Sequence, residues 1–152
     1  MTSASDLRYF QTTWPRLIGL ILFAGLMVAA CLYHFREPDG FAAMLPDWVP
    51  LRLPIVYATA VLELAIAVLV LIPATRGWTG LFAALYLVVI VVANIYAAAR
   101  GIPAPGSDSA SKTALWLRVA AQPLLVWWAL WCTRYPSRDT SLKGPPRKQA
   151  RS

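Results

Sequence analysis

Four long apolar stretches dominate this chain, and short polar connections separate them. The stretches cover residues 17–33, 53–72, 78–99 and 114–132. A bilayer core about 30 Å thick is crossed by roughly 20 helical residues, and each stretch is close to that length. Backbone groups in lipid must be hydrogen-bonded within the segment, which favours helices over single strands. The sequence therefore predicts an all-α integral membrane four-helix bundle of up-down topology, with helices at about 14–33, 53–72, 78–99 and 114–133.

The composition points to the lipid bilayer as the main partner of this chain. Hydrophobic residues make up 59% of its 152 residues and charged residues 14%, a more apolar balance than that of soluble domains. The net charge of +7 does not indicate nucleic acid, because six of the fourteen Lys and Arg residues follow Cys132, outside the apolar stretches. We interpret residues 134–152 as a basic, disordered tail that sets topology and contacts anionic lipid, after a transmembrane domain over residues 1–133.

Four spans place both termini on the same side of the membrane. Nine basic residues lie on that side, six of them in the tail, against four on the opposite side. Positive residues are retained on the cytoplasmic side, so both termini are expected in the cytoplasm. An alternative is cleavage before Cys31, since Val28-Ala29-Ala30-Cys31 has the small residues of a lipoprotein signal. The aromatic residues after Cys31 do not form the polar linker of such proteins, so we prefer an uncleaved first helix.

The connection over residues 36–54 has two interpretations. Phe41, Met44, Leu45 and Trp48 recur there at helical spacing between prolines. The segment is either a short amphipathic piece in the membrane interface, broken near Pro46, or an irregular loop with some apolar residues. Both remain open, and the predicted fold includes the interfacial segment.

Two charged residues lie deep within the apolar stretches, and such residues mark candidate functional sites. Glu63 is near the middle of the second helix, and Arg118 is about one turn from the end of the fourth. Gln122 shares a helix face with Arg118 at i, i+4 spacing, and Asn94 in the third helix is level with Arg118. The predicted intramembrane polar cluster is Glu63, Asn94, Arg118 and Gln122, with His34 and Arg36 at its outer mouth.

This cluster also has two interpretations. It is either an internal hydrogen-bonded group in which Glu63 and Arg118 neutralise each other, or a small polar cavity open to the outside. In a cavity, Glu63 would exchange a proton or bind a polar head group, and a quinone would suit the apolar walls and few donors. No cofactor is otherwise evident. One histidine and two cysteines near opposite ends of the bundle, Cys31 and Cys132, provide neither a metal site nor a disulfide.

Small and aromatic residues predict how the helices pack. Small residues four apart predict close helix contacts, or a homo-oligomer interface, at Gly25 with Ala29, Gly80 with Ala84 and Ala93 with Ala97. Trp127, Trp128 and Trp131 predict an aromatic belt at the membrane interface.

The order of short motifs along the chain resembles the DoxX-like family of small bacterial membrane proteins. The matching pieces are Ala24-Gly25, His34-Phe35-x-x-Pro38-x-x-Phe41, Pro46-x-x-x-Pro50, Val56-Tyr57-Ala58-Thr59 before Glu63-Leu64, Pro73-Ala74-Thr75-Arg76, Ala93-Asn94-Ile95-Tyr96, and Leu117-Arg118 with Gln122-Pro123. One departure is Ala60, where that pattern usually has Gly. The resemblance implies a location in the bacterial cytoplasmic (inner) membrane and a link to quinone or thiol redox chemistry.

From this resemblance we expect an accessory or anchoring subunit of a redox membrane system. It would act with a redox partner protein and bind a quinone near Glu63 and Arg118. The alternative is a small oligomeric transporter or proton-coupled permease that uses the same cluster. An autonomous enzyme is not expected, because the sequence shows no nucleophile–base pair, metal-ligand set or phosphate-binding loop.

Overall fold

The computed structural model describes residues 13–134 of the chain. Within that range it contains five helices and no strand: α2 (Trp14–Arg36), α3 (Pro38–Ala43), α4 (Arg52–Leu71), α5 (Arg76–Arg100) and α6 (Lys112–Thr133). All but α3 are long and apolar enough to cross a membrane. The predicted all-α four-helix membrane bundle is confirmed. Except for Arg134, the expected tail over residues 134–152 lies outside the described residues.

The helices extend beyond the apolar residues that predicted them. α2 continues to Arg36, past the expected end at residue 33. α5 continues to Arg100, where Gly101 adopts a left-handed conformation (φ 65°) and ends the helix. α6 begins at Lys112, because the Ser111 side chain accepts the backbone N–H of Ala114 at 3.4 Å. Hydropathy marks the apolar centre of a span, whereas capping determines its polar end turns.

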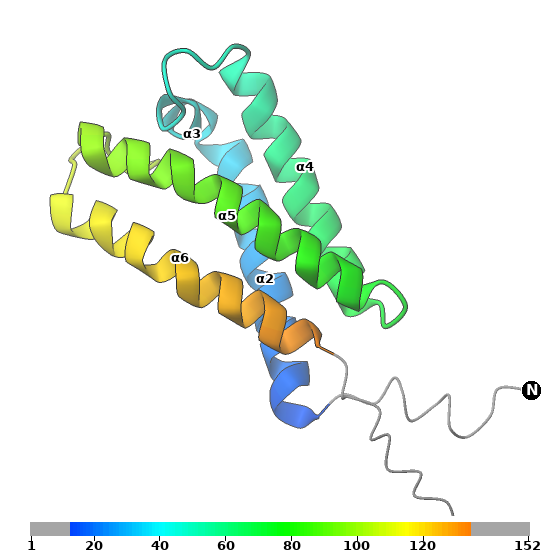
Figure 1. The fold of residues 1–152 in the computed structure, drawn as a ribbon. Coiled ribbons are helices and arrows are strands. Elements are labelled where there is room, and N and C mark those ends of the chain that lie inside the picture. The colour runs from blue at the N-terminus through cyan, green and yellow to red at the C-terminus, as the bar shows by residue number, and fades with distance from the viewer. Residues whose placement is uncertain (1–12, 135–152) are drawn as a thin grey trace, which may run out of the picture.

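The long helices form two pairs, α2 with α4 and α5 with α6 (Figure 1). Consecutive long helices run in opposite directions, so the start of α2, the α4–α5 turn and the end of α6 lie at one end of the bundle. We call this the termini end. α3 and the 101–111 loop lie at the opposite end, which we call the α3 end. The two pairs converge at the termini end and diverge toward the α3 end (Figure 1).

An apolar core fills the half of the bundle nearer the termini end. The largest of its fully buried side chains come from α2, α4 and α6 and are Leu20, Phe23, Ile66, Val70 and Cys132, and α5 contributes the fully buried Ala83. α5 approaches closely through Gly80, where an added Cβ would overlap the side chain of Thr133. The α5–α6 contact therefore depends on the absence of a side chain at this position.

Two of the three α6 tryptophans that the sequence predicts at the membrane interface also pack against the core. Trp128 and Trp131 are half-buried against the core, and the rings of Trp128 and Phe23 meet edge to face with centroids 5.8 Å apart. Trp127 remains exposed. Trp128 and Trp131 therefore contact α2 near Gly19, in addition to the interfacial position that the sequence predicts for them.

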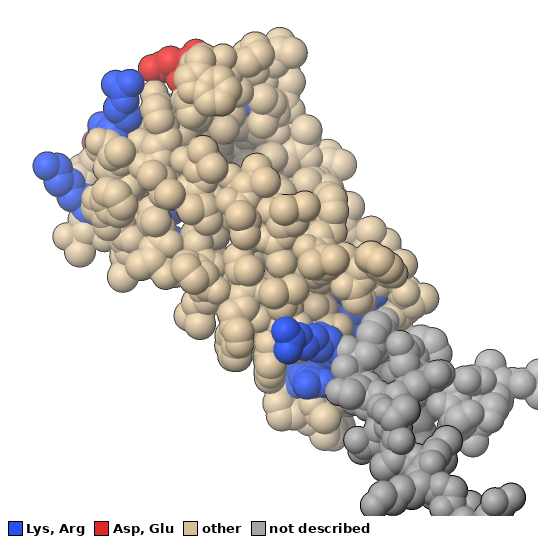
Figure 2. All heavy atoms as spheres, in the orientation of Figure 1, with Lys and Arg blue, Asp and Glu red and all other residues tan. Residues whose placement is uncertain are grey.

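The outer surface of the bundle is largely apolar. Many large hydrophobic side chains on the four long helices are exposed, as lipid contact requires. Figure 2 shows the charged side chains concentrated at the two ends of one face, with a broad uncharged band between them. Gly25 and Ala29 also face outward, and an added Cβ on Gly25 would meet nothing within 4 Å. The helix contact expected at this pair is therefore absent within residues 13–134.

Arg76 fixes the turn between α4 and α5 at the termini end. Its buried guanidinium donates from Nε to the carbonyl of Val70 at 3.3 Å and from Nη2 to the carbonyl of Leu71 at 3.4 Å. Thr75 Oγ1 donates to the carbonyl of Leu69 at 2.7 Å. The last carbonyls of a helix have no partner within it, and these side chains supply one. We call this group of contacts the Arg76 clasp.

The connection between α2 and α4 combines the two interpretations left open by the sequence. α3 is a short helix, and the chain from Met44 to Leu51 is irregular. Trp48 and Leu51 are exposed, whereas Met44 is buried against the bundle. The apolar residues of this connection therefore lie in two kinds of structure. The first is the short helix α3, which covers the bundle at the α3 end, and the second is an irregular loop with exposed apolar side chains.

Candidate functional site

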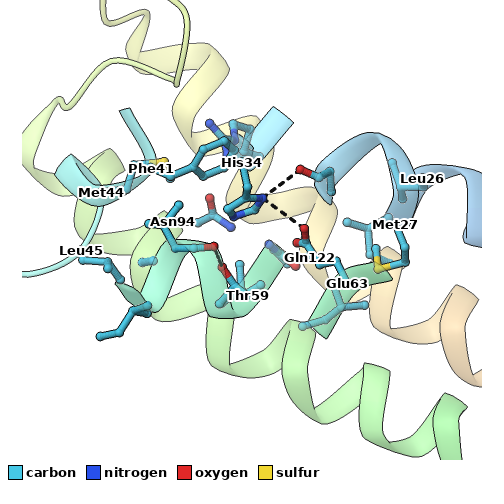
Figure 3. Close-up of a pocket in the computed structure, with 18 of the residues that line it drawn as sticks. Leu26, Met27, His34, Phe41, Met44, Leu45, Thr59, Glu63, Asn94 and Gln122 are labelled. Carbon is cyan, nitrogen blue, oxygen red and sulfur yellow. Dashed lines mark hydrogen bonds and ion pairs between the residues drawn. The ribbon is translucent and has the colours of Figure 1, made fainter. Parts of the chain in front are cut away.

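A cavity of about 340 Å³ lies in the half of the bundle nearer the α3 end, where the helix pairs diverge. Side chains from all five described helices converge on it (Figure 3). Most of its wall is apolar and includes Leu26, Met27, Ile55, Leu87, Ile90 and Leu125. Its polar residues are His34, Thr59, Glu63, Asn94, Arg118 and Gln122. A cavity of this size, with apolar walls and a few convergent polar groups, is typical of small-molecule sites.

The structure places all four residues of the predicted polar cluster on this cavity. Glu63 comes from α4, Asn94 from α5, and Arg118 and Gln122 from α6. Glu63, Asn94 and Gln122 are buried, and Arg118 is half-buried. Depth along each helix was sufficient to select these residues because charged and amide side chains avoid lipid.

The two residues expected at the outer mouth, His34 and Arg36, point in different directions. His34 is buried and lines the cavity, but Arg36 is exposed and is not part of the lining. Arg36 Nε lies 3.6 Å from Glu37 Oε1 instead. Residues two apart on a helix do not share a face, so α2 can direct only one of this pair inward.

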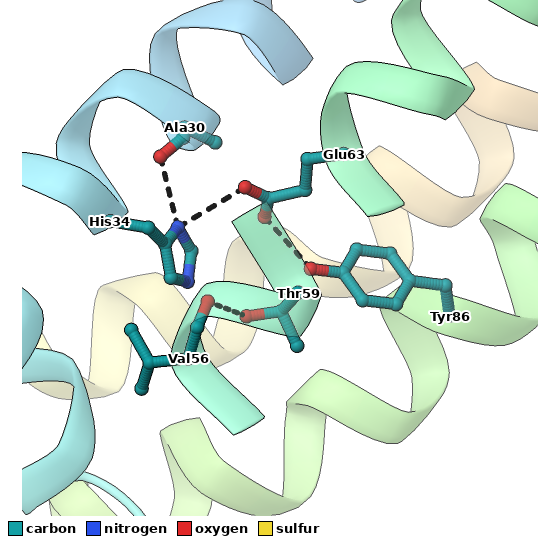
Figure 4. A network of polar contacts seen from close by, with 6 residues as sticks. All are labelled: Ala30, His34, Val56, Thr59, Glu63 and Tyr86. Carbon is teal, nitrogen blue, oxygen red and sulfur yellow. Dashed lines mark hydrogen bonds and ion pairs between the residues drawn. The ribbon is translucent and has the colours of Figure 1, made fainter. Parts of the chain in front are cut away.

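Glu63 is held by two aromatic side chains (Figure 4). Its Oε1 accepts a hydrogen bond from Tyr86 Oη at 2.8 Å, and its Oε2 lies 3.1 Å from His34 Nδ1. His34 Nδ1 also lies 2.9 Å from the carbonyl of Ala30, one turn earlier in α2. The buried carboxyl group thus joins α4 to α5 through Tyr86 and to α2 through His34.

The contacts of His34 assign the proton on Nδ1. A carbonyl oxygen only accepts, so the 2.9 Å approach to Ala30 requires an N–H on Nδ1. One N–H cannot point fully at two acceptors, and no donor is directed at Glu63 Oε2. The 3.1 Å ion-pair distance is therefore proximity without a well-aligned hydrogen bond. Glu63 Oε2 keeps the capacity to accept a further hydrogen bond.

Arg118 does not neutralise Glu63 as the first interpretation of the cluster expected. Among residues 13–134, the ion partner of Glu63 is His34, and no ion pair or hydrogen bond joins Arg118 to another side chain. Tyr86 donates to one carboxyl oxygen of Glu63, and His34 Nδ1 lies 3.1 Å from the other. Arg118 instead lines the cavity with its charge unmatched by any described carboxylate.

Gln122 is a second acceptor without a donor. It is buried, and its Oε1 has no hydrogen-bond partner in the described part of the chain. A buried polar atom without a partner costs about 1–3 kcal/mol. Native structures contain few such atoms, and here both lie on the wall of one cavity, where a donor that enters the cavity can reach them.

Phe41 of α3, with Met44 and Leu45 just after it, forms the roof of the cavity, and the 101–111 loop packs on α3 at Gly40. The ring of Phe41 stacks on His34 with centroids 3.8 Å apart and an interplanar angle of 16°. Tyr33 Oη donates to the carbonyl of Pro105 at 2.7 Å, which ties α2 to the loop. Gly40 allows α3 to approach the same residue, because an added Cβ there would lie 2.9 Å from Pro105 Cα. α2 therefore contacts the roof directly through the stack of His34 on Phe41, and it contacts the loop that supports the roof through Tyr33.

Sequence reasoning missed Tyr86 and Phe41 as site residues. Tyr86 had a usable signal, since it lies seven residues before Ala93 and shares its helix face, which was expected to point inward. A buried tyrosine hydroxyl also needs a partner, and Glu63 was the obvious acceptor. Phe41 had no comparable signal, because the path of the α2–α4 connection is not determined by helical spacing.

A metal centre finds no support in the described residues, where no three His, Cys, Asp or Glu side chains are grouped as ligands. Cys31 and Cys132 are both buried and unpaired within residues 13–134. Cys132 lies in the apolar core, while Cys31 follows the cavity residue Ala30 in α2. Their separation along the bundle is the reason that no disulfide was expected.

A family model described as "Domain of unknown function (DUF8561)" matches residues 23–133. The chain belongs to the DUF8561 family. The resemblance to the DoxX-like family is therefore wrong. Its motif pieces are short, and small residues, prolines and aromatic residues near helix ends recur in unrelated membrane helices. The DUF8561 match includes every residue that lines the cavity. No match was found among curated proteins or among solved structures.

Proposed function

We propose that this protein binds a small amphiphilic molecule in the cavity between its helix pairs. The apolar part of the ligand contacts the walls, and a hydrogen-bond donor on its head meets Glu63 and Gln122. The observation that carries this proposal is the pair of buried acceptors without donors, Glu63 Oε2 and Gln122 Oε1, on the wall of one largely apolar cavity.

The size and chemistry of the cavity limit the ligand. Small-molecule sites occupy about 300–1,000 Å³, and this cavity is near the lower limit. It suits one ring or a short chain rather than a whole phospholipid. A quinol is one suitable head, because its apolar ring carries two hydroxyl donors for the two acceptors.

The biological role that we propose is an accessory subunit that presents such a ligand to a redox partner protein. Its support is the fit of a quinol-sized head to the cavity. The resemblance that first suggested redox chemistry no longer contributes, because the chain belongs to DUF8561. Copurification of a redox enzyme with the protein from native membranes would support this role, and purification alone without a quinone would contradict it.

A binding measurement tests the proposal directly. Protein in lipid nanodiscs is titrated with a short-chain quinol, and empty nanodiscs correct for partition into lipid. Gln122→Leu removes one acceptor at nearly constant size and is expected to weaken binding about tenfold. Leu85→Ala, on the exposed face of α5, serves as the control and should leave the affinity unchanged. Equal affinity for Gln122→Leu and wild type would contradict the proposed contact.

A second candidate function is transport as an oligomeric, proton-coupled permease. The observation that favours it is the position of His34 Nδ1 beside the cavity, 2.9 Å from the Ala30 carbonyl oxygen and 3.1 Å from Glu63 Oε2. In proteoliposomes, a pH gradient should drive uptake of the bound amphiphile, and Glu63→Gln should abolish the drive while leaving binding measurable. An uptake rate that is the same with and without the pH gradient would exclude proton coupling.

The membrane orientation is also a proposal. We place both termini in the cytoplasm of a bacterial cell, supported by the excess of basic residues on the termini side. A fluorescent protein fused to the C-terminus should be bright, whereas a periplasm-dependent reporter at the same place should be inactive. The reverse pattern would place the α3 end in the cytoplasm.

A further inference from the structure

Arg118 provides information about the ligand that the two acceptors do not. It projects from α6 into the cavity lining and is half-buried. A guanidinium remains charged in proteins, and taking it out of water without a counter-ion is costly. Its position beside an apolar cavity therefore calls for an anion or a strong acceptor nearby.

The carboxylates in the described chain that form ion pairs are engaged elsewhere. Glu63 is held by His34 and Tyr86. Glu37 faces Arg36 at 3.6 Å, and Asp47 accepts from Arg52 at 2.9 Å.

The two remaining carboxylates of residues 13–134, Asp39 and Asp108, are exposed and do not line the cavity. The charge of Arg118 thus has no described protein partner. The cavity therefore combines an unmatched cation with two acceptors that lack donors.

The helix positions of these groups order them along the cavity. α6 enters the bundle from the α3 end, and Arg118 precedes Gln122 by four residues, or about 6 Å along the helix axis. Glu63 and Gln122 lie at similar depths, roughly 15 Å from the starts of their helices at the α3 end. The cation is therefore closer to the α3 end and the orphan acceptors are deeper.

From this arrangement we infer that the ligand of the proposed site is an amphiphilic hydroxy acid. Its negative group binds Arg118, and a hydroxyl a few ångströms away donates to Glu63 Oε2 or Gln122 Oε1. This inference rests on the proposed function and specifies its substrate class. An uncharged quinol satisfies the acceptors but leaves Arg118 without an anion. A simple fatty acid supplies an anion for Arg118 but no hydrogen-bond donor for the two acceptors.

Four related probes separate the two contacts. They are an alkyl-substituted hydroxybenzoic acid, its methyl ester, its methyl ether and the compound with both methyl groups. Each is titrated into the full chain in nanodiscs, with empty nanodiscs as the correction for lipid partition. Wild-type protein should bind the hydroxy acid at least about tenfold more tightly than either the ester or the ether.

Two variants assign each preference to its residue. Arg118→Gln should lower the affinity for the acid to that for the ester and so remove the preference for acid. Gln122→Leu should reduce the preference for hydroxyl over ether and leave the preference for acid intact. Lys112→Gln, an exposed cation in the first turn of the same helix, is the matched control and should retain wild-type selectivity. Arg118→Lys should keep part of the preference for acid, which covers the case in which Arg118→Gln fails to fold.

The outcomes distinguish this inference from the function on which it rests. Equal wild-type affinity for acid and ester overturns the inference while leaving the binding function in place. So does an Arg118→Gln variant that weakens all four probes equally. Failure of every probe, together with failure of the quinol, overturns the proposed function itself.

Discussion

The two halves of this bundle are built from the same four helices but have opposite interiors. In the half nearer the termini end, Leu20 and Phe23 are completely buried in a continuous apolar core. In the half nearer the α3 end, the later turns of α2 line a cavity together with Glu63 and Arg118. Close packing in one half fixes the helix pairs, and their divergence creates space for polar side chains in the other. Stability and ligand binding are therefore expected to respond to different residues.

The largest difference in the free energy of unfolding is expected between two leucine-to-alanine substitutions in α2, one in each half of the bundle. Leu20→Ala opens a cavity in the closed half and should lower the free energy of unfolding by about 2–5 kcal/mol. Leu26→Ala only enlarges an existing cavity at a partly exposed position and should cost under about 1 kcal/mol. Denaturant titration in mixed micelles, followed by tryptophan fluorescence, measures both. Equal losses would mean that the two halves do not differ in packing.

Glycine substitutions test the close helix approach in the closed half. Gly80→Ala places a methyl group against Thr133 and should lower the free energy of unfolding by about 1–3 kcal/mol. Gly25→Ala faces open space and should be neutral or stabilise by up to about 1 kcal/mol through helix propensity. The same denaturant titration applies. A stable Gly80→Ala variant would show that α5 and α6 can separate without loss.

Tyr86→Phe tests the boundary between the two halves. It removes the donor to Glu63 Oε1 while keeping the ring in the core, and should cost roughly 1–2 kcal/mol. Tyr57→Phe, on an exposed position of α4, is the matched control and should change nothing measurable. If both variants behave alike, the Tyr86–Glu63 hydrogen bond does not contribute to the fold.

The smallest effect on stability is expected from filling the cavity. Ala93→Leu adds a side chain to the cavity wall and should change the free energy of unfolding by no more than about 0.5 kcal/mol, because space is available. It should nevertheless weaken quinol or hydroxy-acid binding at least about tenfold by occupying the site. Ala99→Leu, exposed on the same helix, should leave binding unchanged. Unaltered binding to Ala93→Leu would place the ligand elsewhere.

The sequence predicted the spans and the depth of the polar residues but not the contacts among them. Apolar length identifies a membrane helix, and a charged residue within it is informative because lipid excludes it. Depth alone could not choose between Arg118 and His34 as the ion partner of Glu63. That choice depends on how each helix rotates about its axis, and a helix that is apolar on every side gives little evidence of its rotation.

The sequence did not predict the roof of the cavity or the family to which the chain belongs. The stack of Phe41 on His34 depends on the path of a loop, which no periodicity describes. The DoxX-like resemblance relied on short motif pieces that many membrane helices share, and the match over residues 23–133 overturned it. Polar residues deep within a membrane helix were therefore more informative about the site than short sequence motifs.

The Arg76 clasp limits how the cavity can change its width. It joins α4 and α5 at the termini end, so relative movement of these helices is mainly an angular change about that point. α5 has 25 residues and is therefore about 37 Å long. A change of about 5° at the clasp displaces its far end by about 3 Å, close to the diameter of a water molecule. A small change of angle at the termini end is thus amplified into a larger change of width at the end that contains the cavity.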